Sequence, residues 1–170
     1  NFYLGSIHGN QGQMERALNY FNQSLKLSLE KNCNTYFRRI YYSKALVFYN
    51  TNQLDSSLFF IDKWQAEIDE SNKLTLARSY QLRAFCYSKL NQVIDELNDL
   101  KIALELMDQV LIDSKDFHEI QEKNHLVNIY NRVCQLHLNE AYDLDSMIVY
   151  KDEALDWINK YGSKNDTILF

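Results

Sequence analysis

Proline is absent from the 170 residues of this chain, and glycine occurs only four times. At the average usage of roughly 5%, a chain of this length would carry about eight prolines. Because both residues interrupt helices, their scarcity allows long helices joined by tight turns. The three cysteines, Cys33, Cys86 and Cys134, have neither CxxC spacing nor the density of a disulfide scaffold. We therefore interpret them as buried thiols on helices.

Other absences exclude whole classes of function. No apolar run approaches the roughly 20 residues that cross a bilayer, so we expect no membrane span. The net charge of −5 argues against a general nucleic-acid binder. No GxSxG, P-loop, GxGxxG or kinase signature occurs, so we expect no enzyme and no cofactor. The chain opens at Asn1 already inside a helical pattern, and we interpret it as a piece of a longer protein.

What the chain does contain is self-similarity, because three of its segments align almost without gaps. Each segment places a small residue before a bulky one, then a turn residue, and then a second apolar series. The aligned positions are Gly5, His8, Gly12, Ala17, Phe21 and Ser24; Ala45, Phe48, Asn52, Ser57, Ile61 and Trp64; and Ala84, Tyr87, Asn91, Glu96, Leu100 and Ala103. The offset is 40 residues from Gly5 to Ala45 and 39 residues from Ala45 to Ala84. A nearly fixed period of this size is typical of a stacked-repeat array, in which no unit buries its apolar face alone.

The apolar spacing predicts eight helices, at about 1–10, 13–31, 35–50, 53–70, 73–90, 92–115, 118–139 and 143–161. They form four repeats, at about 1–33, 34–72, 73–116 and 117–161, followed by a tail at 162–170. The fourth repeat is eroded. Aligning Cys134 with Ala84 places Ser146 at the position of Glu96, but a slip of one residue that uses Met147 and Ala154 is nearly as good.

The pattern resembles the tetratricopeptide repeat. The first repeat carries the closest match, in Leu4, Gly5, His8, Gly12, Ala17, Phe21 and Ser24. The resemblance implies an all-α, right-handed α-solenoid of about four helix-turn-helix repeats that binds proteins or peptides. Each repeat is longer than the usual unit of this family and lacks its closing proline. These departures suggest the long-repeat relatives in bacterial signalling and regulatory proteins.

Charge separates the two kinds of helix. Over 35–50, 73–90 and 126–139, the first helices of repeats two to four contain no acid, and apart from the end residue Lys73 they carry Arg38, Arg39, Lys44, Arg78, Arg83, Lys89 and Arg132. The second helices carry seventeen acids against five lysines (Lys63, Lys101, Lys115, Lys151 and Lys160). In arrays that resemble this family the first helices line the concave surface. That surface would then be cationic and would attract an acidic segment or a free C-terminal carboxylate. Ordinary solubility patterning would produce the same split.

The resemblance also implies which residues line the groove. In the second repeat they are Arg39, Tyr42, Leu46, Tyr49 and Asn50; in the third, Arg78, Gln81, Phe85, Ser88 and Lys89; and in the fourth, Asn128, Asn131 and Gln135. Arginine can hold a carboxylate bidentately, and the amides and aromatic rings can contact a peptide backbone and its apolar side chains. For each aromatic residue, packing against a neighbouring helix is the competing interpretation.

Two histidines share a helical face with a carboxylate, at His118, Glu122 and His125. They do not form an HExxH motif and have no nearby cysteine, so we expect no metal site.

The alternative function is a sensory or dimerisation region of a bacterial transcriptional regulator or signalling kinase, in which the chain would form a homodimer. RNA binding through the basic helices is a third option, and it would show a steep dependence on salt.

Overall fold

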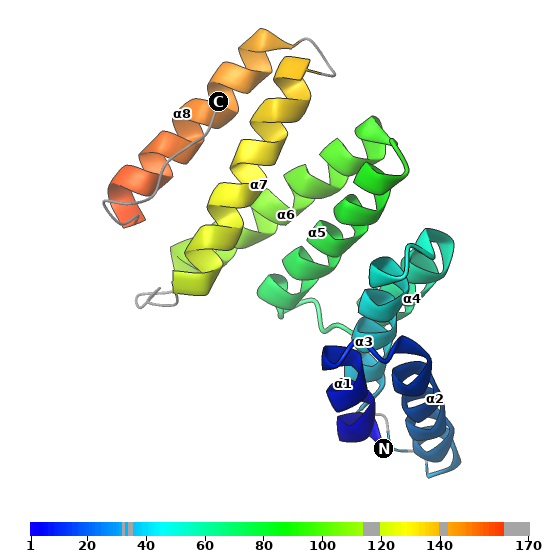
Figure 1. Ribbon diagram of the computed structural model, residues 1–170. Coiled ribbons are helices and arrows are strands. Elements are labelled where there is room, and N and C mark those ends of the chain that lie inside the picture. Colours follow the sequence, from blue (N-terminus) through cyan, green and yellow to red (C-terminus); the bar gives the residue numbers. More distant parts are fainter. Residues whose placement is uncertain (32, 34–35, 114–119, 140–142, 162–170) are drawn as a thin grey trace. The chain divides into compact units, whose positions relative to one another are not determined.

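The computed structural model describes residues 1–161 except residues 32, 34–35, 114–119 and 140–142 (Figure 1). At 111–113, 120–125, 157–158 and 160–161 it describes the backbone alone. Within these limits the chain is all-α, and its eight helices form four helix-turn-helix pairs. The helices are α1 (Phe2–Asn10), α2 (Met14–Glu30), α3 (Phe37–Asn50), α4 (Leu54–Ala66), α5 (Lys73–Lys89), α6 (Val93–Asp113), α7 (Ile120–Asn139) and α8 (Leu144–Tyr161).

The helical pairs divide into two compact units. Unit 1 spans Asn1–Asn72 and contains α1 to α4, and unit 2 spans Lys73–Phe170 and contains α5 to α8. In unit 1, α3 lies against α2 and also contacts α1. In unit 2, α7 lies against α6. Each unit therefore stacks one pair on the next. This is the packing of a tetratricopeptide-like α-solenoid, and the expected fold class is confirmed.

The turns within the first three pairs have the same backbone geometry. Gly12, Asn52 and Asn91, which the sequence alignment made equivalent, all have left-handed φ angles, of 73°, 57° and 56°. Glycine adopts this region without strain, and asparagine tolerates it better than most residues. In each turn the next residue donates its N–H to a carbonyl five positions earlier, as Gln13 does to His8 at 2.9 Å. The repeat seen in the sequence thus corresponds to a repeated helix-turn-helix hairpin in the structure.

The predicted end of one helix is wrong. The pattern predicted a helix over 53–70, but α4 ends at Ala66. The last turn tightens, because the N–H of Ile68 donates to the carbonyl of Gln65, three residues earlier. Asp69 then accepts hydrogen bonds from the N–H and the hydroxyl of Ser71, at 2.9 and 2.5 Å. This local side-chain turn competes with helix continuation, even though Ile68 keeps the apolar spacing and is buried.

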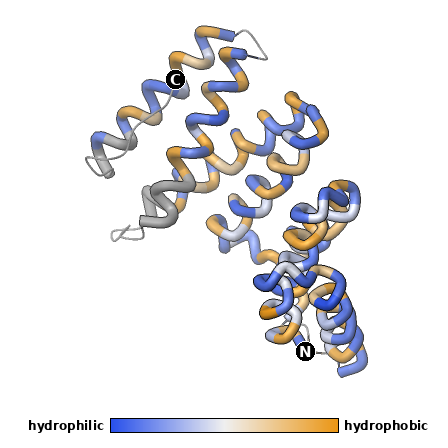
Figure 2. The backbone as a smooth tube through the Cα atoms, viewed as in Figure 1, coloured by the Kyte–Doolittle hydropathy of each residue, from blue (hydrophilic) through white to orange (hydrophobic). Residues whose placement is uncertain are grey.

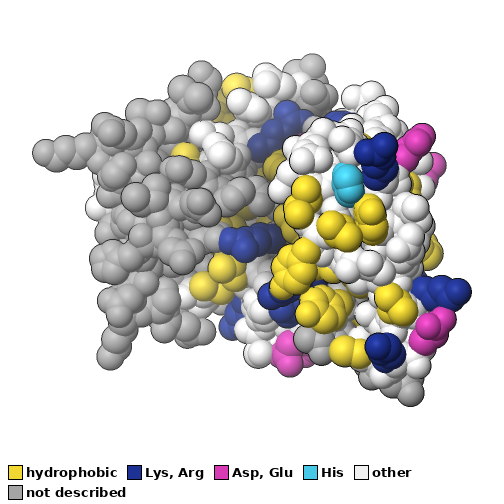
Figure 3. All heavy atoms as spheres, turned by 60° about the horizontal axis from the view of Figure 1, so that its bottom comes forward, with side chains coloured by type: hydrophobic (Ala, Val, Ile, Leu, Met, Phe, Trp, Pro, Cys, Tyr) yellow, Lys and Arg dark blue, Asp and Glu magenta, His cyan; other side chains and the backbone are white. Residues whose placement is uncertain are grey.

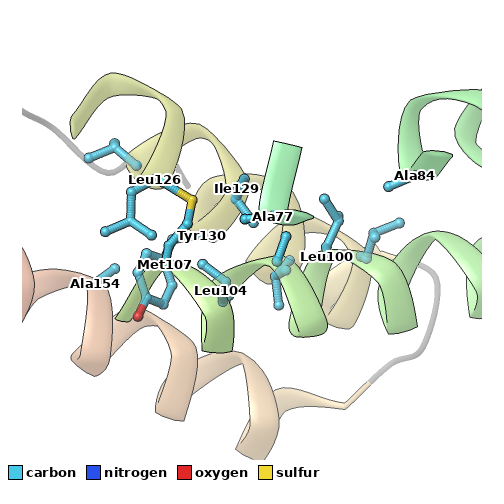
Figure 4. Close-up of a cluster of buried hydrophobic side chains, with 13 residues drawn as sticks. Ala77, Ala84, Leu100, Leu104, Met107, Leu126, Ile129, Tyr130 and Ala154 are labelled. Carbon is cyan, nitrogen blue, oxygen red and sulfur yellow. The ribbon is translucent and has the colours of Figure 1, made fainter. Parts of the chain in front are cut away.

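Each pair is held together at a small residue. Gly5, Ala45, Ala84 and Cys134 are all buried, as expected for positions where the first helix approaches its partner closely. Around them, hydrophobic residues recur at helical intervals and do not form long runs (Figure 2). In unit 1 one core cluster contains Ala17, Phe21, Ile40 and Val47. Unit 2 has its own cluster, drawn from α5, α6, α7 and α8, which includes Leu100, Met107, Leu126, Tyr130 and Ala154 (Figure 4).

Candidate protein-binding groove

A groove of about 240 Å³ lies in unit 1 between α1 and α3, with α2 beneath it. Apolar side chains and small polar ones line it, and none of them is acidic or basic. The lining residues are Ser6, Gly9, Asn10, Met14, Phe21, Tyr42, Ser43, Leu46, Val47 and Asn50. One wall of the groove therefore comes from the first helix of repeat one, and the other from the first helix of repeat two.

Three of the residues predicted for the second repeat meet in this groove. Tyr42, Leu46 and Asn50 lie at intervals of four along α3, so they share one helical face. Arg39 is exposed one turn before Tyr42, but it is not among the lining residues. Tyr49 is half-buried and does not line the groove either.

The aromatic ring of Tyr42, which lines the groove, is held in place by a buried tryptophan of α4. The ring of Tyr42 packs against that of Trp64 on α4, with 4.6 Å between the ring centroids. Trp64 is 4% exposed, whereas Tyr42 is 40% exposed. One face of Tyr42 is thus fixed by the core while the rest of the side chain is available to a ligand. This arrangement orders an anchor residue before binding and reduces the entropy that binding would cost.

The wall formed by α1 depends on a close approach to α2. A Cβ atom added to Gly5 would lie 2.6 Å from the ring of Phe21, closer than real carbon atoms pack. Only glycine therefore fits where α1 crosses the buried Phe21 ring. This contact lets α1 pack closely against α2. Ser6, Gly9 and Asn10 of α1 then line the groove.

The α1 wall was not predicted from the sequence, because groove residues were assigned only in repeats two to four. A usable signal was present. The alignment that pairs Gly5 with Ala45 also pairs Asn10 with Asn50 and Ser6 with Leu46. The groove positions assigned to repeat two therefore identify their counterparts in repeat one. Neither Asn10 nor Asn50 has a side-chain hydrogen bond within the part of the chain that the structure describes.

Three of the seven cations expected to make the first helices basic, Lys44, Arg83 and Arg132, bind partners on neighbouring helices, although 40% of the Arg132 side chain is exposed. Lys44 is 7% exposed. Its Nζ donates to Asn22 Oδ1 at 2.8 Å and lies 4.0 Å from the centre of the Phe60 ring. Burial lowers the pKa of Lys44. The ammonium group is thus a packing element of α2, α3 and α4.

The other two cations, Arg83 and Arg132, form bidentate ion pairs with α6. Arg83 donates through Nε and a terminal nitrogen to Asp99, both at 2.7 Å, and the pKa of Arg83 is raised chiefly by these bonds. Arg132 donates to Glu96 at 2.6 and 2.9 Å, and also to Ser88 Oγ at 3.1 Å. Glu96 is only 2% exposed. These arginines neutralise buried carboxylates and connect α5, α6 and α7.

The remaining predicted residues belong to unit 2. On α5, Arg78, Phe85 and Lys89 are exposed, Ser88 is half-buried and Gln81 is buried. On α7, Asn128 and Gln135 are exposed and Asn131 is half-buried. Phe85 is thus accessible as an aromatic contact, whereas burial of Gln81 removes it from a surface that a ligand could reach.

A second pocket of about 290 Å³ lies at the opposite end of α1. Its walls include Phe2, Tyr3, Leu27 and Tyr36. Figure 3 shows hydrophobic side chains adjoining one another on unit 1, with lysine and arginine side chains around them. This pocket is larger than the groove, but three of its lining residues, Lys31, Cys33 and Tyr36, are neighbours in the sequence of residues that the structure does not describe. The groove between α1 and α3 is therefore the better-defined site.

The structure also bears on metal binding and membrane insertion. Among the described residues, no group of three His, Cys, Asp or Glu side chains is placed to hold a metal ion. The side chains of His118, Glu122 and His125, and the tail at 162–170, lie outside the described residues. Within the described part of the chain, no helix is both long and apolar enough to span a membrane.

Comparison with known families gives a match on α1 and α2, the pair that includes the α1 wall of the groove. The tetratricopeptide repeat model matches residues 2–31, which are α1 and α2. The chain carries a tetratricopeptide repeat. Repeats of this family generally mediate protein–protein interactions and are typically not enzymes. No curated protein matches the chain.

Proposed function

We propose that this tetratricopeptide-repeat chain is a scaffold that binds a segment of a protein partner in the groove between α1 and α3. The observation that carries the proposal is the convergence of Tyr42, Leu46 and Asn50 with Ser6 and Asn10 around one groove. Aromatic and amide side chains of this kind supply buried contact area and hydrogen bonds to a main chain. The α1 wall of the groove belongs to the repeat that the family model matches, and the family's general role is consistent with the proposal.

Charge enters the proposal through Arg39. This residue is exposed on α3 one turn from Tyr42, and its planar guanidinium suits a carboxylate of the partner, either an acidic side chain or a chain terminus. Arg78, Phe85 and Lys89 on α5, with Asn128, Asn131 and Gln135 on α7, are the proposed contacts of unit 2. Lys44, Arg83 and Arg132 are left out because their charges are used internally.

A site-specific photo-crosslinker tests the proposal directly. A photoreactive phenylalanine analogue at Leu46, in the groove, is expected to crosslink a partner in extracts of the source cells. The same analogue at Ile94, which is 76% exposed on α6, is expected not to crosslink it. In parallel, Asn50→Ala should weaken capture of the crosslinked protein at least tenfold, which corresponds to about 1.4 kcal/mol.

Asn98→Ala is the matched control, because Asn98 is an exposed asparagine on α6 outside the groove. For the charged contact, Arg39→Glu is paired with Lys26→Glu, a similar change at an exposed residue of α2. Crosslinking from position 94 with none from position 46, or equal capture by Asn50→Ala and Asn98→Ala, would show that the partner binds elsewhere.

A further inference from the structure

The groove between α1 and α3 is chemically uniform in one respect: no residue that lines it carries a charge. Its polar groups at the far end from Arg39 are the carboxamides of Asn10 and Asn50, one from each wall. Both are exposed. Each carboxamide offers a donor and an acceptor, which is the pair of functions that a peptide bond also presents.

The size of the groove limits what it can hold. At about 240 Å³ it lies below the range of about 300–1,000 Å³ that is typical of small-molecule sites. Met14, Phe21, Leu46 and Val47 give it an apolar interior. A single aliphatic side chain, with the main chain on either side of it, matches both this volume and this lining.

We propose that the stretch of the partner inside this groove is extended and uncharged, with one aliphatic side chain seated against Phe21 and Leu46 and its main chain bonded by Asn10 and Asn50. This inference rests on the proposed function and specifies its ligand. An acidic residue in this stretch would lose hydration without gaining a cation, which disfavours binding. Removing a peptide group from water costs less free energy, because the two carboxamides replace the hydrogen bonds that the peptide group made to water. The anionic group of the partner, which Arg39 would bind, then lies outside this stretch.

Gly9 keeps the space for that side chain open. It lines the groove and carries no side chain, while its counterpart in the second repeat is the half-buried Tyr49. A Cβ atom added to Gly9 would have Ala17 Cβ, 3.8 Å away, as its nearest neighbour, and this is an ordinary contact. The fold of α1 therefore has room for a Cβ atom at this position, and a side chain longer than alanine would extend beyond it beside the groove that Gly9 lines.

The test is a selection of random dodecapeptides, displayed on phage, against the full chain. We expect the enriched peptides to share an uncharged core that contains one Leu, Ile, Val or Met. A synthetic peptide of that sequence is then compared with versions in which a core Asn or Gln is replaced by Asp or Glu. The acidic versions should bind at least tenfold more weakly, as measured by fluorescence anisotropy.

Two variants at Gly9 make the test specific to the groove. Gly9→Leu should lower the affinity for the selected peptide at least tenfold, and its melting temperature is measured in parallel to check that the variant stays folded. Gly9→Ala is the matched control, and it should lower affinity less than threefold. Unchanged affinity in Gly9→Leu would overturn the inference.

The outcomes separate the two proposals. If the enriched peptides have acidic cores but lose affinity in Asn50→Ala, the groove binds a partner and the uncharged-ligand inference is wrong. If no peptide is enriched, or if enriched peptides bind Asn50→Ala as well as the unaltered chain, both the inference and the proposed function fail. Uncharged peptides that are sensitive to both Asn50→Ala and Gly9→Leu support both.

Discussion

Single residues in this chain show how the same position takes different chemistry in successive repeats. The alignment of repeats two and three makes Lys44 equivalent to Arg83, and Phe60 equivalent to Asp99. In the second repeat the ammonium group of Lys44 lies 4.0 Å from the centre of the Phe60 ring. In the third, Arg83 forms a bidentate pair with Asp99. The cation keeps its place, and its partner changes from an aromatic face to a carboxylate.

Two glycines of α1 have opposite surroundings, and this predicts opposite effects of one substitution. Gly5→Ala would drive Cβ to 2.6 Å from the Phe21 ring. We expect it to lower the free energy of unfolding by about 1–2 kcal/mol, since the cost of overpacking exceeds the gain in helix propensity. Gly9→Ala should raise it by about 0.5–1 kcal/mol, because its Cβ makes only an ordinary contact. Urea unfolding followed by circular dichroism measures both, and changes of the same sign would contradict this account.

At the scale of helices and turns, the fourth pair resolves an ambiguity that the sequence left open. The N–H of Asp143 donates to the carbonyl of His137 at 2.8 Å, as Gln13 donates to that of His8. The turn at the fourth pair is therefore one residue longer. Met147 then takes the position of Glu96, and the buried Ala154 takes that of Ala103. The slipped alignment is correct.

Helix number and approximate bounds were predictable here because apolar spacing and turn residues specify them locally. Where the structure describes the residue that follows a helix, α1, α2, α3 and α5 end within one residue of the prediction. The exception is α4, where the side chain of Asp69 binds Ser71 and closes a turn. Hydrophobic periodicity does not detect such a hydrogen bond, because the bond depends on the carboxylate of one residue and not on the hydrophobicity of the segment.

The last turn of α7 contains a histidine whose protonation should weaken the fold. His137 is 3% exposed and stacks on Tyr150, and neither of its ring nitrogens has a hydrogen-bond partner among the described residues. Burial lowers the pKa of His137 and Lys101 lowers it further, while Asp143, 3.6 Å away, acts in the opposite direction. The folded state thus binds its proton less readily than the unfolded state does. This contribution to stability is present above about pH 6.5 and is lost as pH falls through the lowered pKa.

His137→Phe tests that prediction, because Phe48 fills the equivalent position in repeat two and stacks on Phe60. The variant should lose less stability than the unaltered chain between pH 7.5 and pH 5, as measured by the unfolding free energy in urea. It should also be more stable by about 1 kcal/mol at pH 7.5, since two buried polar atoms without partners are removed. Parallel pH profiles for the two proteins would show that His137 does not titrate in this way.

At the scale of the molecule, the part of the site that was predicted lies within one helix and the part that was missed lies between helices. The family resemblance implied Tyr42, Leu46 and Asn50 as groove residues, and all three lie on one face of α3. That Gly5 sets α1 against Phe21, and so adds Asn10 to the groove, is a tertiary contact. The use of Lys44 and Arg83 inside the fold is also tertiary, because formal charge does not report whether a partner lies on the next helix.

The two units lead to a last prediction about how stability is distributed. Unit 1 and unit 2 each have a core cluster of their own, and in repeat arrays stability depends on neighbouring repeats. Val133→Ala, at a fully buried position of α7, should destabilise the core of unit 2 by about 1–3 kcal/mol. In native-state hydrogen exchange, amides of α6 and α7 should then lose protection while those of α1 and α2 keep theirs.

Ile40→Ala, at a fully buried position of α3, is the reciprocal variant and should affect α1 and α2 but not α7. Local loss of protection in each variant means that each unit opens on its own, because the deleted side chain packs only within its own cluster. A uniform loss of protection in both variants would instead mean that the chain unfolds as a single cooperative body. The groove between α1 and α3 would then depend on the core of unit 2 as much as on its own walls.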